Sequence, residues 1–212
     1  MKPVKIFLIG VGGQGSILAS RILSEAALKM GIAVVMSEVH GMAQRGGIVE
    51  TAVILGGLKS PLIRKGDADV LIAFEPNEAL RALPYCSAGA TVFINTRPII
   101  PAMVSLGKAP YLEPDNVIAV ISQSVGEIKA FDATALAEKA GTAKATNIVM
   151  LGALIGSDLL PITTDILKEV VSQFVPQKTL QMNLRAFELG INAGWLIKNN
   201  SSCKNESGSF ST

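Results

Sequence analysis

The feature that most constrains the fold is an apolar run that leads straight into a glycine-rich turn near the N-terminus. Residues 4–9 read VKIFLI, and GVGGQG follows at residues 10–15. Residues 16–30 then carry apolar side chains on one helical stripe, and Gly31 is placed to cap it. Residues 32–36 are again apolar and rich in β-branched side chains. This order predicts a strand, a tight turn, a helix and a second strand, which form a β-α-β unit with a right-handed crossover.

The rest of the chain is predicted to add strands first and helices afterwards. Further strands are expected at residues 48–55, 69–74, 91–94 and 117–121, with a short helix that starts at Glu75-Pro76. Helices are expected at residues 133–140, 147–157, 165–174 and 179–197. Residues 199–212 are a polar tail that is expected to be disordered. We therefore expect one Rossmann-like α/β domain over residues 1–198, a wound and mostly parallel sheet flanked by helices, with a helical C-terminal part.

The composition limits the classes of partner. The 212 residues include 19 Lys and Arg against 17 Asp and Glu, and no basic block of the kind that binds nucleic acid. Only 17% of the residues are charged and the mean hydropathy is +0.43, yet no apolar run approaches the ~20 residues that cross a bilayer. Nucleic acid and membrane are thus not expected as partners. Such an apolar chain indicates either a surface that another subunit covers or a core rich in Ala and Ile, and the sequence leaves both open.

The cysteines and the single histidine limit the metal chemistry. Cys86 and Cys203 lie far apart in the sequence, so they form no disulfide framework and indicate a reducing cytoplasm. The N-terminal residues do not have the pattern of a secretory signal. A cubane iron–sulfur cluster needs about four thiolates, and a zinc site needs several His or Cys ligands. We therefore expect no metal site on this chain.

The glycine turn has the spacing of a phosphate-binding loop. Gly10, Gly12 and Gly15 satisfy G-x-G-x-x-G at a point where the helix start offers free N–H groups to an anion. Glu38 stands where a dinucleotide fold places the acid that binds the ribose, although it lies farther from Gly15 than usual. A dinucleotide site, another anion or cofactor site, and a tight turn without a ligand all stay open. Gln14 is expected either to donate to a ligand or to cap the turn.

The stretch SEVHGMAQRGG at residues 37–47 holds several candidate functional groups. Because it follows a predicted strand, we expect it at the carboxyl edge of the sheet, beside residues 10–15. Arg45 can bind a carboxylate or phosphate through two hydrogen bonds, and Gly46-Gly47 leaves the backbone free to form an anion nest. His40 is a candidate general base, but no Ser, Cys or paired carboxylate stands in evident relation to it, so a packing or interface role is favoured.

These two motifs together resemble one protein family. GVGGQG and SEVHGMAQRGG are similar to the gamma-type subunit of the 2-oxoacid:ferredoxin oxidoreductases, and EVHGMAQRGG is most similar to the beta subunits of the indolepyruvate type. The likeness continues through residues 67–75, 147–153 and 183–190, and covers about residues 4–197.

The resemblance implies a reaction in which an aryl pyruvate such as indolepyruvate is oxidatively decarboxylated with coenzyme A. The products are an arylacetyl-CoA, carbon dioxide and reduced ferredoxin. It also implies that a large (alpha) subunit holds thiamine diphosphate, magnesium and 4Fe-4S clusters, since this sequence lacks the cysteines and a Gly-Asp-Gly segment for them. The chain is therefore expected to be an obligate subunit, inactive alone, that completes or supports the cofactor site of its partner.

The residues expected to face a cofactor come from both motifs and are Gly10, Gly12, Gly13, Gln14, Gly15, Arg45, Gly46 and Gly47. Glu38 and His40 are possible site or interface residues, and no residue is assigned a catalytic role. Asp69 and Glu75 are either ligand-facing or solvated strand ends, and Asn147 is expected to cap a helix. The alternative functions are a free-standing NAD- or flavin-dependent oxidoreductase, the gamma subunit of a pyruvate or other 2-oxoacid oxidoreductase, and a pure assembly scaffold.

Overall fold

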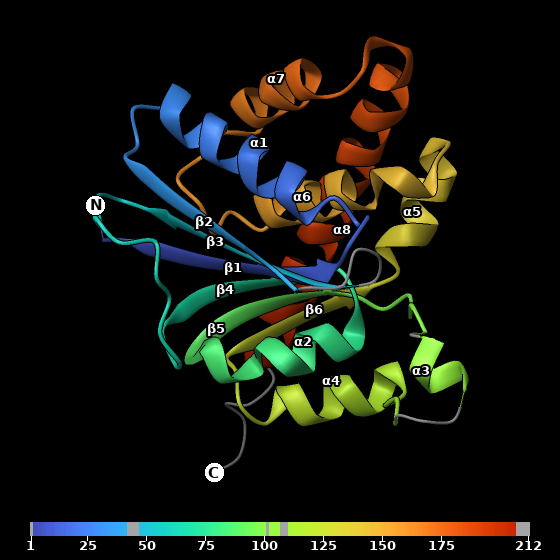
Figure 1. The fold of residues 1–212 in the computed structure, drawn as a ribbon. Coiled ribbons are helices and arrows are strands. Elements are labelled where there is room, and N and C mark those ends of the chain that lie inside the picture. The colour runs from blue at the N-terminus through green and yellow to red at the C-terminus, as the bar shows by residue number, and fades with distance from the viewer. Residues whose placement is uncertain (1, 42–46, 101, 107–109, 207–212) are drawn as a thin grey trace.

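The computed structural model describes residues 2–41, 47–100, 102–106 and 110–206. Within these residues the chain forms a six-stranded sheet in the order β2-β3-β1-β4-β5-β6, with helices on both faces (Figure 1). The strands are β1 (Val4–Val11), β2 (Val34–His40), β3 (Ile48–Leu55), β4 (Ala68–Ala73), β5 (Cys86–Asn95) and β6 (Glu127–Phe131). The helices are α1 (Ser16–Lys29), α2 (Pro76–Ala82), α3 (Ala102–Ser105), α4 (Pro114–Ser122), α5 (Ala133–Ala140), α6 (Thr146–Gly156), α7 (Thr164–Phe174) and α8 (Leu180–Glu206).

The sheet is mostly parallel, as the sequence predicted, but one strand runs against the others. β4 pairs in parallel with β1 and β5, and β5 pairs in parallel with β6. β3 is antiparallel to both of its neighbours, β1 and β2. The predicted unit of β1, α1 and β2 is therefore present, yet β3 folds back from β2 and lies between its two strands. Because Ile48 of β3 pairs with Val11 of β1, the start of β3 lies at the carboxyl edge of β1.

The apolar residues of β1 point alternately into two cores, which explains why residues 6–9 are all apolar. Ile6 and Leu8 belong to the core beneath α1 and the C-terminal helices, whereas Phe7 and Ile9 belong to the core on the side of α2 and α4. In Figure 1, α1, α5, α6, α7 and the start of α8 lie on one face of the sheet, and α2 and α4 lie on the other, while the long α8 continues behind the sheet. A central strand that is covered on both faces has no solvated side, so it carries no polar alternation.

The helices α6 and α8 pack closely because glycines line their contact. A Cβ on Gly190 would lie 2.1 Å from the carbonyl oxygen of Val149, and a Cβ on Gly152 would lie 2.3 Å from the carbonyl oxygen of Phe187. Side chains larger than hydrogen would therefore force the two helices apart. This contact fixes the position of α6, whose first turn reaches the glycine turn described below.

The last helix is longer than the sequence predicted. α8 continues to Glu206, beyond the predicted end at residue 197, so part of the predicted polar tail is helical. Residues 198–206 contain no glycine or proline that would end a helix. Residues 207–212 lie outside the described residues. No helix in the described part of the chain has the length and apolar character that a membrane crossing requires.

One predicted strand is wrong, and a neighbouring strand was not predicted. Residues 117–121 lie in α4, where Pro114 occupies the first turn and Val117 and Ile121 are buried four residues apart. That spacing puts both side chains on one face of a helix, so the apolar run fits a helix as well as a strand. The sixth strand uses residues 127–131, where the buried Lys129 interrupts the apolar pattern and bonds to Glu127 at 2.8 Å.

Candidate functional site

The carboxyl ends of the parallel strands meet at one edge of the sheet, and the glycine turn lies at this edge. The turn follows β1, Glu75 follows β4, Asn95 ends β5 and Asp132 follows β6. The chain leaves β1 for α1 on one face of the sheet and leaves β4 for α2 on the other face (Figure 1). Because β1 and β4 are neighbours, the edge contains a topological switch point, which is where open α/β sheets bind ligands.

The backbone of the turn requires glycine at several positions. Gly13 has a φ of 97° and Gly15 a φ of 77°, which are left-handed conformations that favour glycine. A Cβ on Gly10 would lie 2.6 Å from Oε1 of Gln14. The helix α1 that follows has no side-chain cap and no acidic residue in its first turn. Its first N–H groups have no acceptor within the helix and can therefore bind an anion.

The side chain of Gln14 closes the turn from within. Its Oε1 accepts a hydrogen bond from the N–H of Val11 at 2.7 Å, and its Nε2 donates to the carbonyl of Phe74 at 2.8 Å. The same carbonyl accepts from Nδ2 of Asn95 at 3.0 Å. Both ends of the Gln14 amide are thus used within the chain. Of the two roles that the sequence left open, the geometry supports capping of the turn.

The two N-terminal motifs meet through the backbone. The N–H of Gly12 donates to the carbonyl of Gly47 at 2.8 Å, so the end of the second motif lies against the glycine turn. Residues 37–40 of this motif belong to β2, and the rest connects β2 to β3. Arg45 and Gly46 lie outside the described residues. The roles predicted for Arg45 and Gly46, and for the side chain of His40, stay predictions.

Glu38 is not placed as the ribose-binding acid of a dinucleotide fold would be. It lies on β2, and because β3 separates β2 from β1, the two strands are about 9.6 Å apart instead of about 4.8 Å. Oε1 of Glu38 lies 3.5 Å from Nε of Arg21 on α1. At that distance the two groups form a long ion pair, and the oxygen has no hydrogen-bond partner among the described residues. The strand order thus removes the geometric basis for a dinucleotide site built on Glu38.

Two other residues singled out from the sequence have structural partners. Asn147 is not the cap of α6, because Ala145 precedes the first helical residue; instead its Nδ2 donates to the carbonyl of Gly15 at 3.1 Å. Asp69 lies at the start of β4, away from the carboxyl edge, and accepts a hydrogen bond from the N–H of Lys5 at 2.8 Å. Asn147 therefore belongs to the glycine turn, and Asp69 does not.

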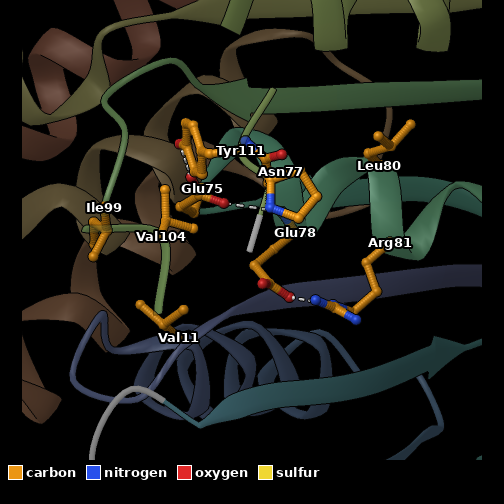
Figure 2. Close-up of a pocket in the computed structure, with 10 residues that line it drawn as sticks. Val11, Glu75, Asn77, Glu78, Leu80, Arg81, Ile99, Val104 and Tyr111 are labelled. Carbon is orange, nitrogen blue, oxygen red and sulfur yellow. Dashed lines mark hydrogen bonds and ion pairs between the residues drawn. The ribbon is translucent and has the colours of Figure 1, made fainter. Parts of the chain in front are cut away.

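A cavity of about 460 Å³ opens beside the end of β1 at the switch point (Figure 2). Glu75 on its wall is 2% exposed, and its carboxylate accepts from the N–H of Glu78 at 2.9 Å and from the hydroxyl of Tyr111. It is therefore neither a solvated strand end nor a free ligand-facing group. Figure 2 shows Glu78 directed toward Arg81, whose Nε donates to it at 3.0 Å. The remaining lining residues are Val11, Asn77, Leu80, Ile99, Val104 and Pro110.

The electrostatics of this cavity follow from burial. Burial raises the pKa of Glu78 above its ordinary value, although Arg81 opposes the shift. Burial also raises the pKa of Tyr111, and the hydrogen bond to Glu75 adds to the effect. Tyr111 is thus held as a neutral hydrogen-bond donor to a buried carboxylate.

Two further cavities lie on either side of the glycine turn, and Gly13 lines both. One, of about 250 Å³, is also lined by Arg97 and Lys144. The other, of about 420 Å³, is lined by Gly15, Ser16 and Arg21 among others. Backbone N–H groups and cationic side chains therefore surround the turn, an arrangement suited to phosphate or carboxylate groups.

Three residues of this edge were not predicted from the sequence to contribute to it: Asn95, Asn147 and Tyr111. Asn95 is 1% exposed and ends a buried apolar strand, so the sequence carried a signal in the form of a polar residue at a strand end. The partners of Asn147 and Tyr111 lie far away in the sequence, and no local pattern indicates them.

Comparisons with known proteins agree with this geometry. Residues 5–193 match the family described as pyruvate ferredoxin/flavodoxin oxidoreductase. The chain is 43% identical over 195 residues to the indolepyruvate oxidoreductase subunit IorB of Thermococcus kodakarensis, a match that covers 91% of this chain and 96% of that one. The gamma subunit of a keto/oxoacid ferredoxin oxidoreductase from Geobacter sulfurreducens has a TM-score of 0.66 and 24% identity, over 91% of this chain and 99% of that one. A 2-oxoglutarate:ferredoxin oxidoreductase from Magnetococcus marinus has a TM-score of 0.70 and 25% identity, over 92% of this chain and 31% of that one.

The fold and the edge motifs thus define a gamma-type α/β subunit of a 2-oxoacid oxidoreductase. The chain belongs to the pyruvate ferredoxin/flavodoxin oxidoreductase family. The relatives at 41 to 43% identity are all named as indolepyruvate oxidoreductase subunits. The family that the two motifs predicted is thus confirmed, and these relatives are of the type that the second motif resembles.

Proposed function

We propose that the complex containing this chain converts an aryl pyruvate and coenzyme A to an arylacetyl-CoA and carbon dioxide, with reduction of ferredoxin. The bond between the carboxylate and the keto carbon breaks, and so does the S–H bond of coenzyme A. A thioester bond to its sulfur forms, the thiol proton is released, and an electron pair passes to ferredoxin one electron at a time. The part of this chain is to complete the surface that faces the coenzyme A or thiamine region of a large partner subunit. The observation that carries this proposal is the hydrogen bond from Gly12 to Gly47, which joins the two family motifs at the carboxyl edge.

Anion binding is the chemistry that supports this role. Both coenzyme A and thiamine diphosphate carry phosphate groups, and the first N–H groups of α1 lack intrahelical acceptors. Arg97 and Lys144 add positive charge beside the turn, although Arg97 is shared with Asp132 at 2.9 Å. Arg45, in the second motif, is proposed as a further contact to the same anion.

We assign thiamine diphosphate, magnesium and 4Fe-4S clusters to the partner. One 4Fe-4S cluster needs about four thiolates, and the two cysteines of this chain cannot provide them. The described residues also contain no group of three or more His, Cys, Asp and Glu placed to hold a metal ion. When bound in the complex, thiamine diphosphate would supply the reactive carbon for decarboxylation, while this chain binds and orients. A buried, free Cys86 is consistent with the cytoplasm, where we place the complex.

The test is co-expression of the chain with a tagged candidate large subunit, followed by an assay of ferredoxin or viologen reduction. Indolepyruvate, phenylpyruvate, pyruvate and 2-oxoglutarate are compared as substrates, with and without coenzyme A. We expect co-purification, and the highest kcat/KM with an aryl pyruvate. A preference for pyruvate or 2-oxoglutarate would instead favour another branch of the family. Failure to co-purify, or a large subunit fully active without this chain, would contradict the proposal.

A further inference from the structure

Asn147 is a polar residue in the first turn of a helix that is otherwise almost entirely apolar and buried. The residues that follow it in α6, from Ile148 to Leu151, all belong to the core. Asn147 itself is only 2% exposed, and its Nδ2 donates to the carbonyl of Gly15, which is 132 positions away in the sequence. Burial of an amide in such surroundings is unfavourable unless its hydrogen bonds are made, so this one contact needs an explanation.

The contact satisfies the Asn147 amide, but neither capping of α6 nor a need of the Gly15 carbonyl accounts for it. Asn147 lies within α6, and the residue before the helix is Ala145. The carbonyl of Gly15 already accepts a hydrogen bond from the N–H of Ala19 at 3.0 Å, the first bond of α1. The bond from Asn147 is therefore additional to what this carbonyl requires. Its effect is on orientation, since a carbonyl held by two donors can turn less freely than a carbonyl held by one.

Gly15 and Asn147 fit each other sterically. Gly15 has a φ of 77°, and a Cβ at this position would lie 2.6 Å from Nδ2 of Asn147. Only glycine therefore allows both the left-handed turn and the close approach of the amide. The need for glycine at residue 15, the third glycine of G-x-G-x-x-G, is thus explained by a contact from α6, whether or not a ligand binds.

The orientation of the Gly15 carbonyl determines the direction of one N–H group at the site. The carbonyl of Gly15 and the N–H of Ser16 belong to the same planar, trans peptide unit and point in opposite directions. The N–H of Ser16 is one of the first of α1 and has no acceptor within the helix. Gly15 and Ser16 both line the cavity of about 420 Å³ beside the turn. A donor that holds the carbonyl therefore also fixes the direction of a free N–H group next to this cavity.

We propose that Asn147 is a positioning residue, which holds the Gly15 peptide so that the N–H of Ser16 is directed at an anionic group of a bound ligand, a phosphate or a carboxylate. This rests on the proposed function, because it assumes that the edge faces a ligand in the complex. Asn147 acts through the peptide and does not touch the ligand. Its loss is therefore expected to weaken binding of one ligand while the chemical step continues.

The experiment uses the two-subunit complex with Asn147→Ala and Asn147→Asp. Asn183→Ala is the matched control, because Asn183 is also buried and its Nδ2 donates to a main-chain carbonyl, that of Thr179, at 2.9 Å. We expect the KM of one ligand to rise about tenfold in the Asn147 variants while kcat changes less than about twofold. A rise in the KM for coenzyme A identifies a phosphate, and a rise in the KM for indolepyruvate identifies a carboxylate. Asn183→Ala should change neither KM.

A second measurement tests the structural step directly. Hydrogen exchange of the amides in residues 12–19 of the complex should become faster in both Asn147 variants and stay unchanged in Asn183→Ala. Equal KM values in the Asn147 and Asn183 variants would overturn the proposal, and so would a loss of assembly in both Asn147 variants, which would show a folding role. A large subunit that is fully active without this chain would refute the proposed function itself. Unchanged hydrogen exchange in the Asn147 variants of the complex would instead refute the positioning role.

Discussion

The carbonyl of Phe74 accepts hydrogen bonds from two side-chain amides, Gln14 at 2.8 Å and Asn95 at 3.0 Å, while a third amide, Asn147, holds Gly15. All three are neutral groups, so they fix the turn without adding a negative charge beside the start of α1. An acidic residue in the same place would compete with an anionic ligand for the N–H groups of the helix. At the scale of single residues, the turn is thus held in place by neutral groups alone.

Arg45 is the residue whose replacement tests the anion site most directly. In the assembled complex, Arg45→Ala is expected to raise the KM for coenzyme A by about tenfold or more, because a hydrogen bond to a charged group contributes about 1.5 to 3 kcal/mol. Steady-state ferredoxin reduction measures this, with Arg185→Ala as the control, since Arg185 is an exposed arginine on α8. Wild-type assembly together with unchanged coenzyme A kinetics would exclude Arg45 from the site.

Glu78 is expected to make the stability of the chain depend on pH in the mildly acidic range. Burial raises its pKa above the ordinary value of 4.5, so the folded chain binds more protons than the unfolded chain just above that pH. The contribution of Glu78 to stability is therefore most favourable at low pH and is lost as pH rises through the raised pKa. Glu78→Gln should reduce this slope in urea unfolding measured from pH 4.5 upward.

The exposed carboxylate of Glu188 provides the control for that experiment. Its side chain is 57% exposed and pairs with Lys168 on the surface, so Glu188→Gln should leave the pH slope close to that of the wild type. Equal slopes in the wild type and in Glu78→Gln would show that Glu78 does not carry the effect.

The roles of single residues were predictable only where the partner is close in sequence. Capping by Gln14 was one of two expected roles, and its first partner, Val11, is three positions away. Asn147 was expected to cap its own helix because such capping is local, whereas its real partner lies on another element. Glu75 was expected at a strand end, and only the tertiary structure shows that Tyr111 covers it.

At the scale of elements, the position of α6 depends on how closely α8 approaches it. Glycines at the contact allow carbonyl groups of each helix to reach the other, and the first turn of α6 then brings Asn147 to Gly15. A change in the packing of these two helices should therefore affect both the stability of the chain and the glycine turn.

Gly190→Ala tests this packing. Its Cβ would lie 2.1 Å from the carbonyl oxygen of Val149, so the helices must separate, and we expect a loss of about 1 to 3 kcal/mol in the free energy of unfolding. Gly89→Ala is the control, because a Cβ there would meet nothing within 4 Å, and its effect should stay within about 0.5 kcal/mol. Urea unfolding of the two variants gives the comparison. Equal stabilities would mean that the contact adjusts without cost.

Most elements were predictable because their patterns are local, and the exceptions have physical causes. The strand at 48–55 is apolar apart from Glu50 and Thr51, and the strand at 69–74 is apolar after Asp69, as expected of strands that are covered on both faces. Residues 117–121 are apolar in a way that fits a helix and a strand equally, and the choice depends on the core that Val117 and Ile121 meet. β6 was missed because Lys129 is buried through a bond to Glu127, which the sequence pattern does not show.

At the scale of the whole molecule, the order of the strands favours a subunit that binds an anion at the glycine turn over a dinucleotide-binding oxidoreductase. The sequence predicted the α/β class and a mostly parallel sheet, but a run of apolar residues does not reveal the direction of a strand. The insertion of β3 between β1 and β2 therefore appeared only in the structure. This insertion leaves the glycine turn at the edge, where a ligand can reach it, and moves Glu38 one strand farther away.

The isolated chain is therefore expected to bind neither NADH nor FAD tightly. A dinucleotide fold needs an acid on the strand next to β1 to bind the ribose. Here Glu38 is on β2, which β3 separates from β1 by about 9.6 Å, and its carboxylate is paired with Arg21. Fluorescence titration with both cofactors measures this, and Glu38→Gln serves as the matched variant. Saturable, tight binding that Glu38→Gln abolishes would show that the acid reaches the ribose despite the inserted strand, and it would favour the alternative of a free-standing oxidoreductase. Weak binding that is the same in both proteins would instead support the ligand proposed for Gly15 and Ser16, which is recognised through a phosphate or carboxylate alone.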